Sequence, residues 1–414
     1  MITNLKKYLP YLLPLLLIFS RSVADITIVL ISILFIYHSY KKLGWGWVKE
    51  KWFCFALIFW VYCLTINSAF SINPTESLAY SLFFIRWPIF AMALAYWILT
   101  DIKSLKKFLL AMTLVLIFII FDTWWQFFFE QDIFGFEKYM PNRLTGPFKG
   151  NPHVGAWIAK LILLPPLFLI LYDKLKLQEH QNCLTYSFFI ISTILFLSVA
   201  ITGERMALLL SLASIFILFI GLALNKIFLL KKISLLLLFS FFAILIFAYS
   251  FPHITERAYF STIEKILNWR TSDYGLVWQS AYDVWVQSPL FGAGLHKYRE
   301  ACENLGIYGS SYLNAIGGGV CFHPHNISIQ LLSETGLVGF ILFYAMVVVL
   351  AFTSLKIYFT SKLWLSFALV FNIIFTCFLP IASSTSFFAN KYGAIVWLLV
   401  GVMLATNRLF KKEN

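Results

Sequence analysis

The sequence predicts an all-α integral membrane protein with about twelve transmembrane helices and one large periplasmic loop that contains short helices. Of its 414 residues, 60% are hydrophobic and only 12% are charged, a composition that soluble globular proteins do not have. Apolar runs of about 17–25 residues, the length needed to cross about 30 Å of hydrocarbon, recur along the whole chain. One long polar stretch, from 251 to 326, interrupts them near the C-terminal end.

Twelve apolar runs define the expected transmembrane helices. The first run is short and the two that flank Arg205 nearly touch, so a count of eleven also fits the pattern. Lys6 and Lys7 precede the first run but no small-residue cleavage site follows it, so we expect a retained helix and not a cleaved signal peptide. In order, the expected spans are residues 8–20, 23–40, 52–70, 80–99, 107–128, 153–172, 184–201, 206–224, 233–250, 333–354, 363–380 and 390–407.

The placement of the basic residues predicts the orientation. With the N-terminus inside, most of the 32 Lys and Arg residues fall in or beside the short inner loops, as the positive-inside rule requires. Both termini are then cytoplasmic. Loop 251–326 faces the periplasm, between a unit of nine helices (1–250) and a unit of three (327–414). Because membrane topology accounts for most of the net charge of +13, we expect membrane lipids and no nucleic acid as partners.

Two cysteines lie on the outer side of this topology. Cys302 and Cys321 both belong to the large loop, and an oxidising periplasm favours a disulfide between them over two free thiols. The bridge would hold His323 and His325 in register with the loop. An amphipathic stretch, 276–286, predicts a helix in the same loop, ended by the Ser-Pro pair that follows it.

Arg205 stands in the first turn of a helix that runs from the outer to the inner face. The positive end of that helix dipole lies beside the arginine, which is unfavourable unless an anion binds there. Helix N-termini and guanidinium groups both suit phosphate oxygens, so this position predicts a phosphate site. The alternative is that Glu204 supplies the compensating charge.

His325 stands at the start of another inward-running helix, with Asn326 as a possible N-cap. A histidine here accepts a proton near neutral pH, and Asn326 or Glu334 would orient it. The alternative is an interfacial histidine bonded to backbone. We expect no metal, because His323 and His325 lack convergent acidic partners and the proline between them restricts the geometry.

Two further arginines are candidates for the site. Arg143 lies in the outer loop 129–152, and Arg86 lies within a span, where a charge is costly and usually functional unless it reaches the interface. The short inner loops contain no glycine loop that would bind the phosphates of a nucleotide. This argues against an ATP-driven motor.

Taken together, these motifs resemble the O-antigen ligase and polymerase superfamily of bacterial envelope glycosyltransferases. The ligases carry a histidine, a small polar residue, nine residues, a glycine, two residues and another glycine, and His325-Asn326 with Gly336 and Gly339 matches this pattern in full. The other matching segments are Arg205 with Leu209 four positions on, Arg143-Leu144-Thr145-Gly146-Pro147-Phe148, and Pro289-Leu290-Phe291-Gly292-Ala293-Gly294.

The chain departs from its relatives at one position. They often carry a further basic residue shortly before the tryptophan matched by Trp278, where this chain reads Ser-Asp-Tyr-Gly over 272–275. Arg270 or Arg257 would then take the second phosphate-binding role. The resemblance implies that Arg205 binds a diphosphate and that His325 acts as base or orients the acceptor. The other residues expected to contact substrate are Arg143, Arg86, His323, Asn326 and Glu334.

The activity that the resemblance implies is metal-independent, inverting glycosyl transfer at the outer face of the bacterial inner membrane, without a cofactor. The donor is a glycan on undecaprenyl diphosphate and the acceptor is a sugar hydroxyl of lipid A–core, as in an O-antigen ligase of lipopolysaccharide biosynthesis. An O-antigen polymerase or a protein O-oligosaccharyltransferase keeps this donor and changes the acceptor. A polysaccharide transporter or flippase is the remaining alternative, although it should show mid-depth charges and repeat symmetry.

Overall fold

The computed structural model describes residues 2–172, 181–224, 234, 238, 241–242, 245–252, 256, 261–306, 321–361, 364–380 and 385–412. Within these residues the regular structure is helical and no β-strand forms, so the all-α prediction is confirmed. The bundle consists of α1 (Ile2–Phe19), α2 (Arg21–His38), η1 (Ser39–Leu43), η2 (Gly46–Lys49), α3 (Lys51–Tyr62), η3 (Cys63–Asn67), α4 (Pro74–Phe84), α5 (Arg86–Ala93), η4 (Leu94–Ile98), α6 (Ile102–Phe129), α7 (Val154–Leu161), α8 (Leu164–Tyr172), α9 (Gln181–Ala200), α10 (Arg205–Leu224), α17 (Ile327–Ser361), α18 (Trp364–Phe378) and α19 (Asn390–Lys412).

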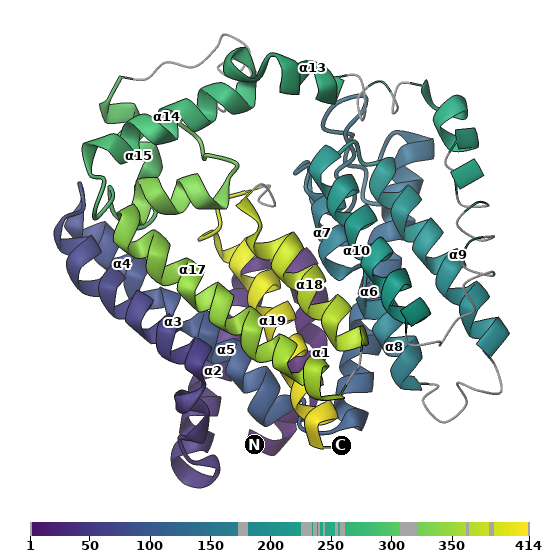
Figure 1. Ribbon diagram of the computed structural model, residues 1–414, viewed down its shortest axis with the longest axis horizontal. Coiled ribbons are helices and arrows are strands. Elements are labelled where there is room, and N and C mark those ends of the chain that lie inside the picture. Colours follow the sequence, from purple (N-terminus) through teal and green to yellow (C-terminus); the bar gives the residue numbers. More distant parts are fainter. Residues whose placement is uncertain are drawn as a thin grey trace.

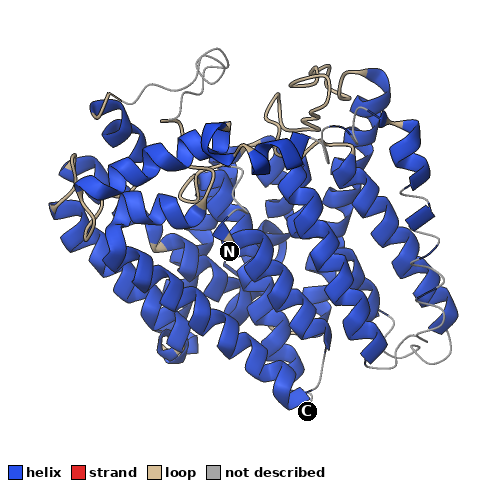
Figure 2. Ribbon diagram, turned by 45° about the horizontal axis from the view of Figure 1, so that its top comes forward, coloured by secondary structure: helices blue, strands red, loops and turns tan. Residues whose placement is uncertain are grey.

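In its described part, the large loop adds four helical elements, α13 (Ser261–Leu267), η6 (Trp269–Thr271), α14 (Asp273–Gln287) and α15 (Tyr298–Asn304). They lie across one end of the bundle, and both ends of the chain lie at the opposite end (Figure 1). We call the end that carries α13, α14 and α15 the loop side. Figure 2 shows that the longer described loops also gather there.

Six helical segments in the described part are long and apolar enough to cross a membrane: Arg21–Leu43, Pro74–Ile98, Ile102–Phe129, Val154–Leu171, Ile327–Lys356 and Asn390–Lys411. Shorter apolar helices cover Tyr8–Phe19, Lys51–Asn67, Tyr186–Ala200, Arg205–Gly221 and Phe367–Phe378. The chain is thus a membrane protein, and eleven of the twelve expected spans coincide with apolar helices. The ninth, 233–250, falls partly outside the described residues.

Proline divides two of the expected spans. The span predicted at 80–99 begins earlier, at Pro74, and turns at Ile85 between α4 and α5. Pro88 has no N–H to donate, and its ring crowds the carbonyl four residues before it, so the helix breaks just ahead of Arg86. In the same way Pro165 and its neighbouring proline interrupt the span at 153–172, between α7 and α8.

The packing brings the helices that carry the candidate residues together. α17 packs against α3 and α18, α10 against α7 and α18, and α19 against α5. Large side chains fill the space between them, and Trp52, Phe343 and Trp397 are fully buried. The loop-side ends of α7, α10, α17 and α19 therefore come from one packed body and not from independent segments.

α14 covers the loop side and confirms the helix expected at 276–286. Ser272 caps it by accepting a hydrogen bond from the Gly275 N–H at 3.2 Å, and it ends at Gln287, ahead of Pro289. Val277, Ala281 and others of its apolar residues are buried. It packs against α15 and α17, so the loop is held onto the bundle next to His325.

Candidate active site

His325 occupies an unusual backbone position directly before α17. Its φ is 51°, in the left-handed region that non-glycine residues rarely adopt and that is often associated with functional sites. The backbone N–H of His325 donates to Nδ1 of His323 at 3.0 Å, and the two rings lie 3.7 Å apart. His323 is buried, so it acts as the support on which the partly buried His325 rests.

The electrostatic surroundings keep His325 neutral. Burial, together with the positive charge of Arg143, lowers the pKa of His325 to about 4. A neutral imidazole retains a lone pair that accepts a proton. A bound anion would act in the opposite direction and raise this pKa, because an opposite charge favours the protonated form.

Asn326 and Glu334 have roles other than orienting the His325 ring. Oδ1 of Asn326 accepts hydrogen bonds from the N–H groups of Ser328 at 2.9 Å and Ile329 at 3.2 Å, which confirms it as the N-cap of α17. The carboxylate of Glu334 accepts from the His296 N–H at 2.9 Å and from the Gln330 amide at 3.1 Å. Glu334 therefore anchors the loop that precedes α15.

The helix that His325 precedes is broken at Gly336, where φ is 66° and ψ is −175°. The segment 289–294 fills the break, and its backbone satisfies the carbonyl groups on one side and the N–H groups on the other. The bonds are Ala293 N–H to Ser333 O at 2.8 Å, Gly294 N–H to Glu334 O at 2.9 Å, Leu337 N–H to Pro289 O at 2.9 Å, and Val338 N–H to Leu290 O at 3.2 Å.

This break explains why both segments are glycine-rich. A Cβ on Gly292 would lie 2.5 Å from the backbone of Glu334, and a Cβ on Gly336 would lie 2.2 Å from the Leu290 carbonyl oxygen. Asn67 closes the junction, since its amide donates to the Glu334 carbonyl at 2.9 Å and to the carbonyl of Phe291 at 2.7 Å. The glycine motif thus shapes the backbone behind His325.

Arg205 is the first residue of α10, as expected, but Glu204 does not face it as its charge partner. Both carboxylate oxygens of Glu204 accept backbone N–H groups at the start of α7, from Gly155 at 2.7 Å and from Ala156 at 3.1 Å. A carboxylate at a helix N-terminus is stabilised by the N–H groups and by the helix dipole. Glu204 is therefore committed to α7.

Arg143, in the loop 129–152, contacts the chain just before α7. Its Nη2 donates to the Pro152 carbonyl at 3.0 Å, whereas its Nε is buried without a hydrogen-bond partner in the described part of the chain. Arg143 lies within electrostatic range of both Arg205 and His325. The structure thus brings these three predicted residues together from a loop, α10 and the start of α17.

Tyr274 of α14 covers this cluster from the loop. Its ring meets the His325 ring edge to face, with centroids 6.1 Å apart, and it lies within electrostatic range of Arg205. Asp273 is also within range of Arg205 but is paired with Lys265 at 2.8 Å. This chain therefore places a phenol beside the histidine.

Among the described residues, no observed contact joins Arg86 or Arg270 to Arg143, Arg205 or His325. The guanidinium of Arg86 binds Asp25 at 3.2 Å and Asn390 at 2.9 Å and lies over the ring of Trp87. It ties α2, α5 and α19 together, which is a structural use of an intramembrane charge. Arg270 is exposed in η6, and Arg257 lies outside the described residues.

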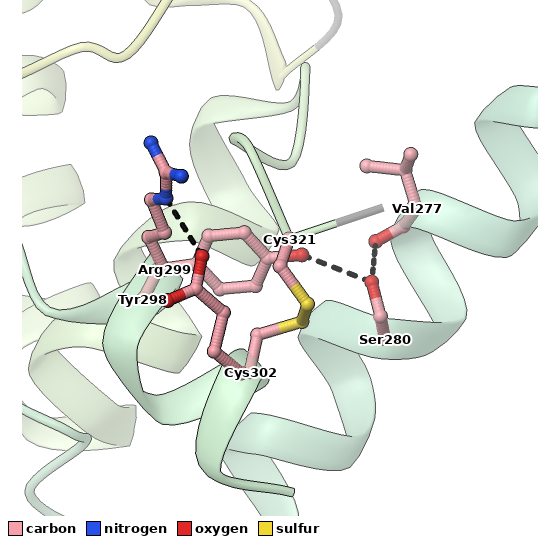
Figure 3. The surroundings of a disulfide bond; sticks show 7 residues. Val277, Ser280, Tyr298, Arg299, Cys302 and Cys321 are labelled. Atoms are coloured by element: carbon pink, nitrogen blue, oxygen red, sulfur yellow. Dashed lines mark hydrogen bonds and ion pairs between the residues drawn. A yellow bond between two sulfur atoms is a disulfide. The ribbon is translucent and has the colours of Figure 1, made fainter. Parts of the chain in front are cut away.

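Cys302 and Cys321 form the predicted disulfide (Figure 3). The bridge joins α15 to the residues just before His323, and both cysteines are buried. Beside it, the hydroxyl groups of Ser280 on α14 and Tyr298 on α15 are 2.9 Å apart (Figure 3). The chain segment that carries His325 is consequently held by a covalent link at one end and by the α17 break at the other.

The side chains that converge at the loop side are suited to anions. Among the described residues, no group of three or more His, Cys, Asp or Glu side chains gathers as a metal site. Two guanidinium groups and an imidazole instead lie near one another, and carboxylates nearby are bound elsewhere. Guanidinium groups recognise phosphate oxygens through paired hydrogen bonds.

Comparison with known families bears on this geometry directly. Residues 188–344 match the family model described as O-antigen ligase. The resemblance to the O-antigen ligase superfamily is confirmed. The matched segment contains Arg205, α14, the disulfide and His325. Among curated proteins, no significant match to the chain is found.

Three residues of the site were not predicted from the sequence. His153 lies at the N-cap position of α7, with its Nδ1 buried and without a partner in the described region. Lys391 is the second residue of α19, and Tyr274 lies on α14. A signal exists only for Lys391, a lysine at the outer edge of the last span where the positive-inside rule disfavours it. The other two depend on tertiary contacts.

Proposed function

We propose that the protein is an O-antigen ligase, which transfers a glycan from undecaprenyl diphosphate to a sugar hydroxyl of lipid A–core. The observation that carries the proposal is the convergence of Arg143, Arg205 and His325 at the loop side. Two of these three residues lie within the O-antigen ligase match. In this proposal the loop side faces the periplasm of the bacterial inner membrane.

His325 acts as the general base. The acceptor hydroxyl oxygen attacks the anomeric carbon, a new C–O bond forms, and the hydroxyl proton passes to the imidazole. The neutral state of His325, whose pKa is lowered to about 4 in the free protein, supports this role. The negative diphosphate of the donor raises that pKa when it binds, so the base becomes stronger when substrate is present.

Arg143 and Arg205 stabilise the leaving group. The bond between the anomeric carbon and the diphosphate oxygen breaks as the new bond forms, and its electron pair remains on the diphosphate. A single displacement from the opposite face inverts the anomeric configuration. Because fixed guanidinium groups supply the positive charge where negative charge develops, the proposed reaction needs no metal.

The length of α17 supports a site at the membrane surface. From Leu337 to Ser361 the helix has 25 residues and is about 37 Å long, which is enough to cross about 30 Å of hydrocarbon. The part between Ile327 and the break is about 13 Å long. His325 would therefore lie beyond the hydrocarbon, where the diphosphate of a polyprenyl lipid meets water.

The test is transfer by the purified protein in detergent, supplied with undecaprenyl-diphosphate glycan, with and without lipid A–core. A single glycan on lipid A–core, and no product without it, is the expected result. A ladder of longer glycans on the lipid donor, indifferent to lipid A–core, would identify a polymerase and overturn the proposal. Transfer to a protein acceptor alone would identify a protein O-oligosaccharyltransferase, with the same consequence.

A further inference from the structure

Lys391, the second residue of α19, has no carboxylate partner in the described part of the chain. Its Nζ lies 3.9 Å from the ring centroid of Phe148 and 5.4 Å from the ring of Trp157. These two rings are 5.1 Å apart, so the ammonium group rests on an aromatic pair. Aromatic faces attract a cation but leave its hydrogen-bond donors unused. Lys391 can therefore still donate to a ligand.

The residues next to this lysine carry further unused polar atoms. Nδ1 of His153 and Nε of Arg143 are both buried without a partner among the described residues. His153 directly follows Pro152, whose carbonyl holds Arg143, and it precedes α7, which carries Trp157. Unsatisfied buried polar atoms are rare in folded proteins and call for a partner that binds there.

Charge balance identifies the missing partner as an anion. His153 lies within electrostatic range of Arg143, Lys391, Lys160 and His325. Lys160 is buried, with its ammonium over the Tyr392 ring, and Lys391 is also within range of Arg21. The carboxylate at the centre, Glu204, is already bound to the start of α7. The cluster is therefore positive, and the side chains, not the helix N-terminus, are left to hold an anion.

Arg143 connects two groups of side chains. It lies in range of Arg205 and His325 and also of His153, which is in turn in range of Lys391. An anion held only by Arg143 and Arg205 would leave Lys391 and His153 without a role. Two linked phosphate groups would use Arg205 and Arg143 together with Lys391 and His153.

We propose that Lys391 and His153 bind the second phosphate of a lipid diphosphate whose first phosphate lies against Arg143 and Arg205. The assignment rests on the proposed function for the identity of the lipid. It predicts that the site distinguishes a polyprenyl diphosphate from a polyprenyl monophosphate through residues of α7 and α19. Lys391 is in this proposal a substrate-binding residue that the sequence motifs do not include.

The experiment measures equilibrium binding of undecaprenyl diphosphate and of undecaprenyl monophosphate to the purified full-length protein in detergent. The variant Lys391→Met keeps the aliphatic stem on the aromatic pair and removes the charge. We expect it to weaken diphosphate binding about tenfold or more, the equivalent of one hydrogen bond to a charged group, and to change monophosphate binding less than about twofold. Lys391→Arg should restore most of the difference.

The matched control is Lys138→Met. Lys138 also lies over an aromatic ring on the loop side, 5.9 Å from Phe127, but it is paired with Glu130 at 2.6 Å. The Lys138→Met variant should bind both lipids as tightly as the unchanged protein does. If Lys391→Met does not fold, His153→Asn provides the same test, because asparagine suits an N-cap position and only the imidazole is lost.

Three results would overturn the assignment. They are unchanged diphosphate binding by both variants, an equal loss of the two lipids, or a loss in Lys138→Met as large as in Lys391→Met. The outcome is separable from that of the proposed function, because binding is measured without transfer. Selective binding through Lys391 in a protein that transfers no glycan would retain this site and remove the proposed activity.

Discussion

Replacing Gly336 by alanine tests whether the packing of segment 289–294 against the break in α17 stabilises the protein. The backbone there, with φ 66° and ψ −175°, falls in a region that only glycine occupies readily, and forcing another residue into it costs about 1–3 kcal/mol. The new Cβ would also lie 2.2 Å from the Leu290 carbonyl oxygen, so segment 289–294 must move. Two backbone hydrogen bonds on that side, from Leu337 and Val338, contribute about 1 kcal/mol each.

A matched glycine separates these effects. Gly44 has φ 77° and ψ −178°, in the same region, but a Cβ there would meet nothing within 4 Å. Gly44→Ala should therefore show the strain alone. Gly336→Ala should lose about 2 kcal/mol more, together with transfer activity, because the half-helix behind His325 shifts. Thermal unfolding in detergent, followed by tryptophan fluorescence, compares the two. If both variants lose the same stability, the packing of segment 289–294 against the break contributes nothing beyond backbone strain, and the proposed role of this junction is refuted.

The remaining predictions concern the site and the disulfide. His325→Ala and Arg205→Ala should each abolish transfer without loss of expression or membrane insertion, and normal product from either would refute the assignment. Because His325 must be neutral to accept a proton, kcat/KM should fall as the pH drops through its pKa of about 4. Arg143→Gln removes a positive charge beside His325, so it should raise this pKa and move the fall in kcat/KM to higher pH. If the fall stays at the same pH, Arg143 does not influence the protonation of His325. Cys302→Ser should reduce stability by roughly 2–4 kcal/mol by opening the loop, and transfer should fall with it; an unchanged melting curve would count against that structural role.

Much of the fold could be predicted because apolar length is read directly from the sequence. Eleven expected spans coincide with helices, since a membrane-crossing helix requires about 20 apolar residues wherever it packs. The divisions at Ile85 and Gly336 were not predicted. Proline accounts for the first, but the second depends on hydrogen bonds from Asn67 and from segment 289–294, which no local pattern contains.

The site was predictable in part for the same reason. Arg143, Arg205 and His325 carry motifs, and the structure brings them together. Glu334 was expected near His325, but it lies nine positions further along the chain, and its carboxylate accepts a hydrogen bond from the loop before α15. His153 and Lys391 belong to no sequence motif. They become candidates for the site only through contacts between α7, α19 and the loop 129–152.

The break in α17 also bears on how the chain enters the membrane. Backbone N–H and C=O groups that are buried without partners are costly, so a helix broken at Gly336 would be unstable if its partners were not yet made. They are made first, because Asn67 and segment 289–294 both precede Gly336 in the order of synthesis. When Gly336 leaves the ribosome, Asn67 and segment 289–294 have already been synthesised and can form hydrogen bonds with the backbone on either side of the break. If α17, α18 and α19 were synthesised as a separate chain before the rest of the protein, the backbone groups at the Gly336 break would lack these hydrogen-bond partners.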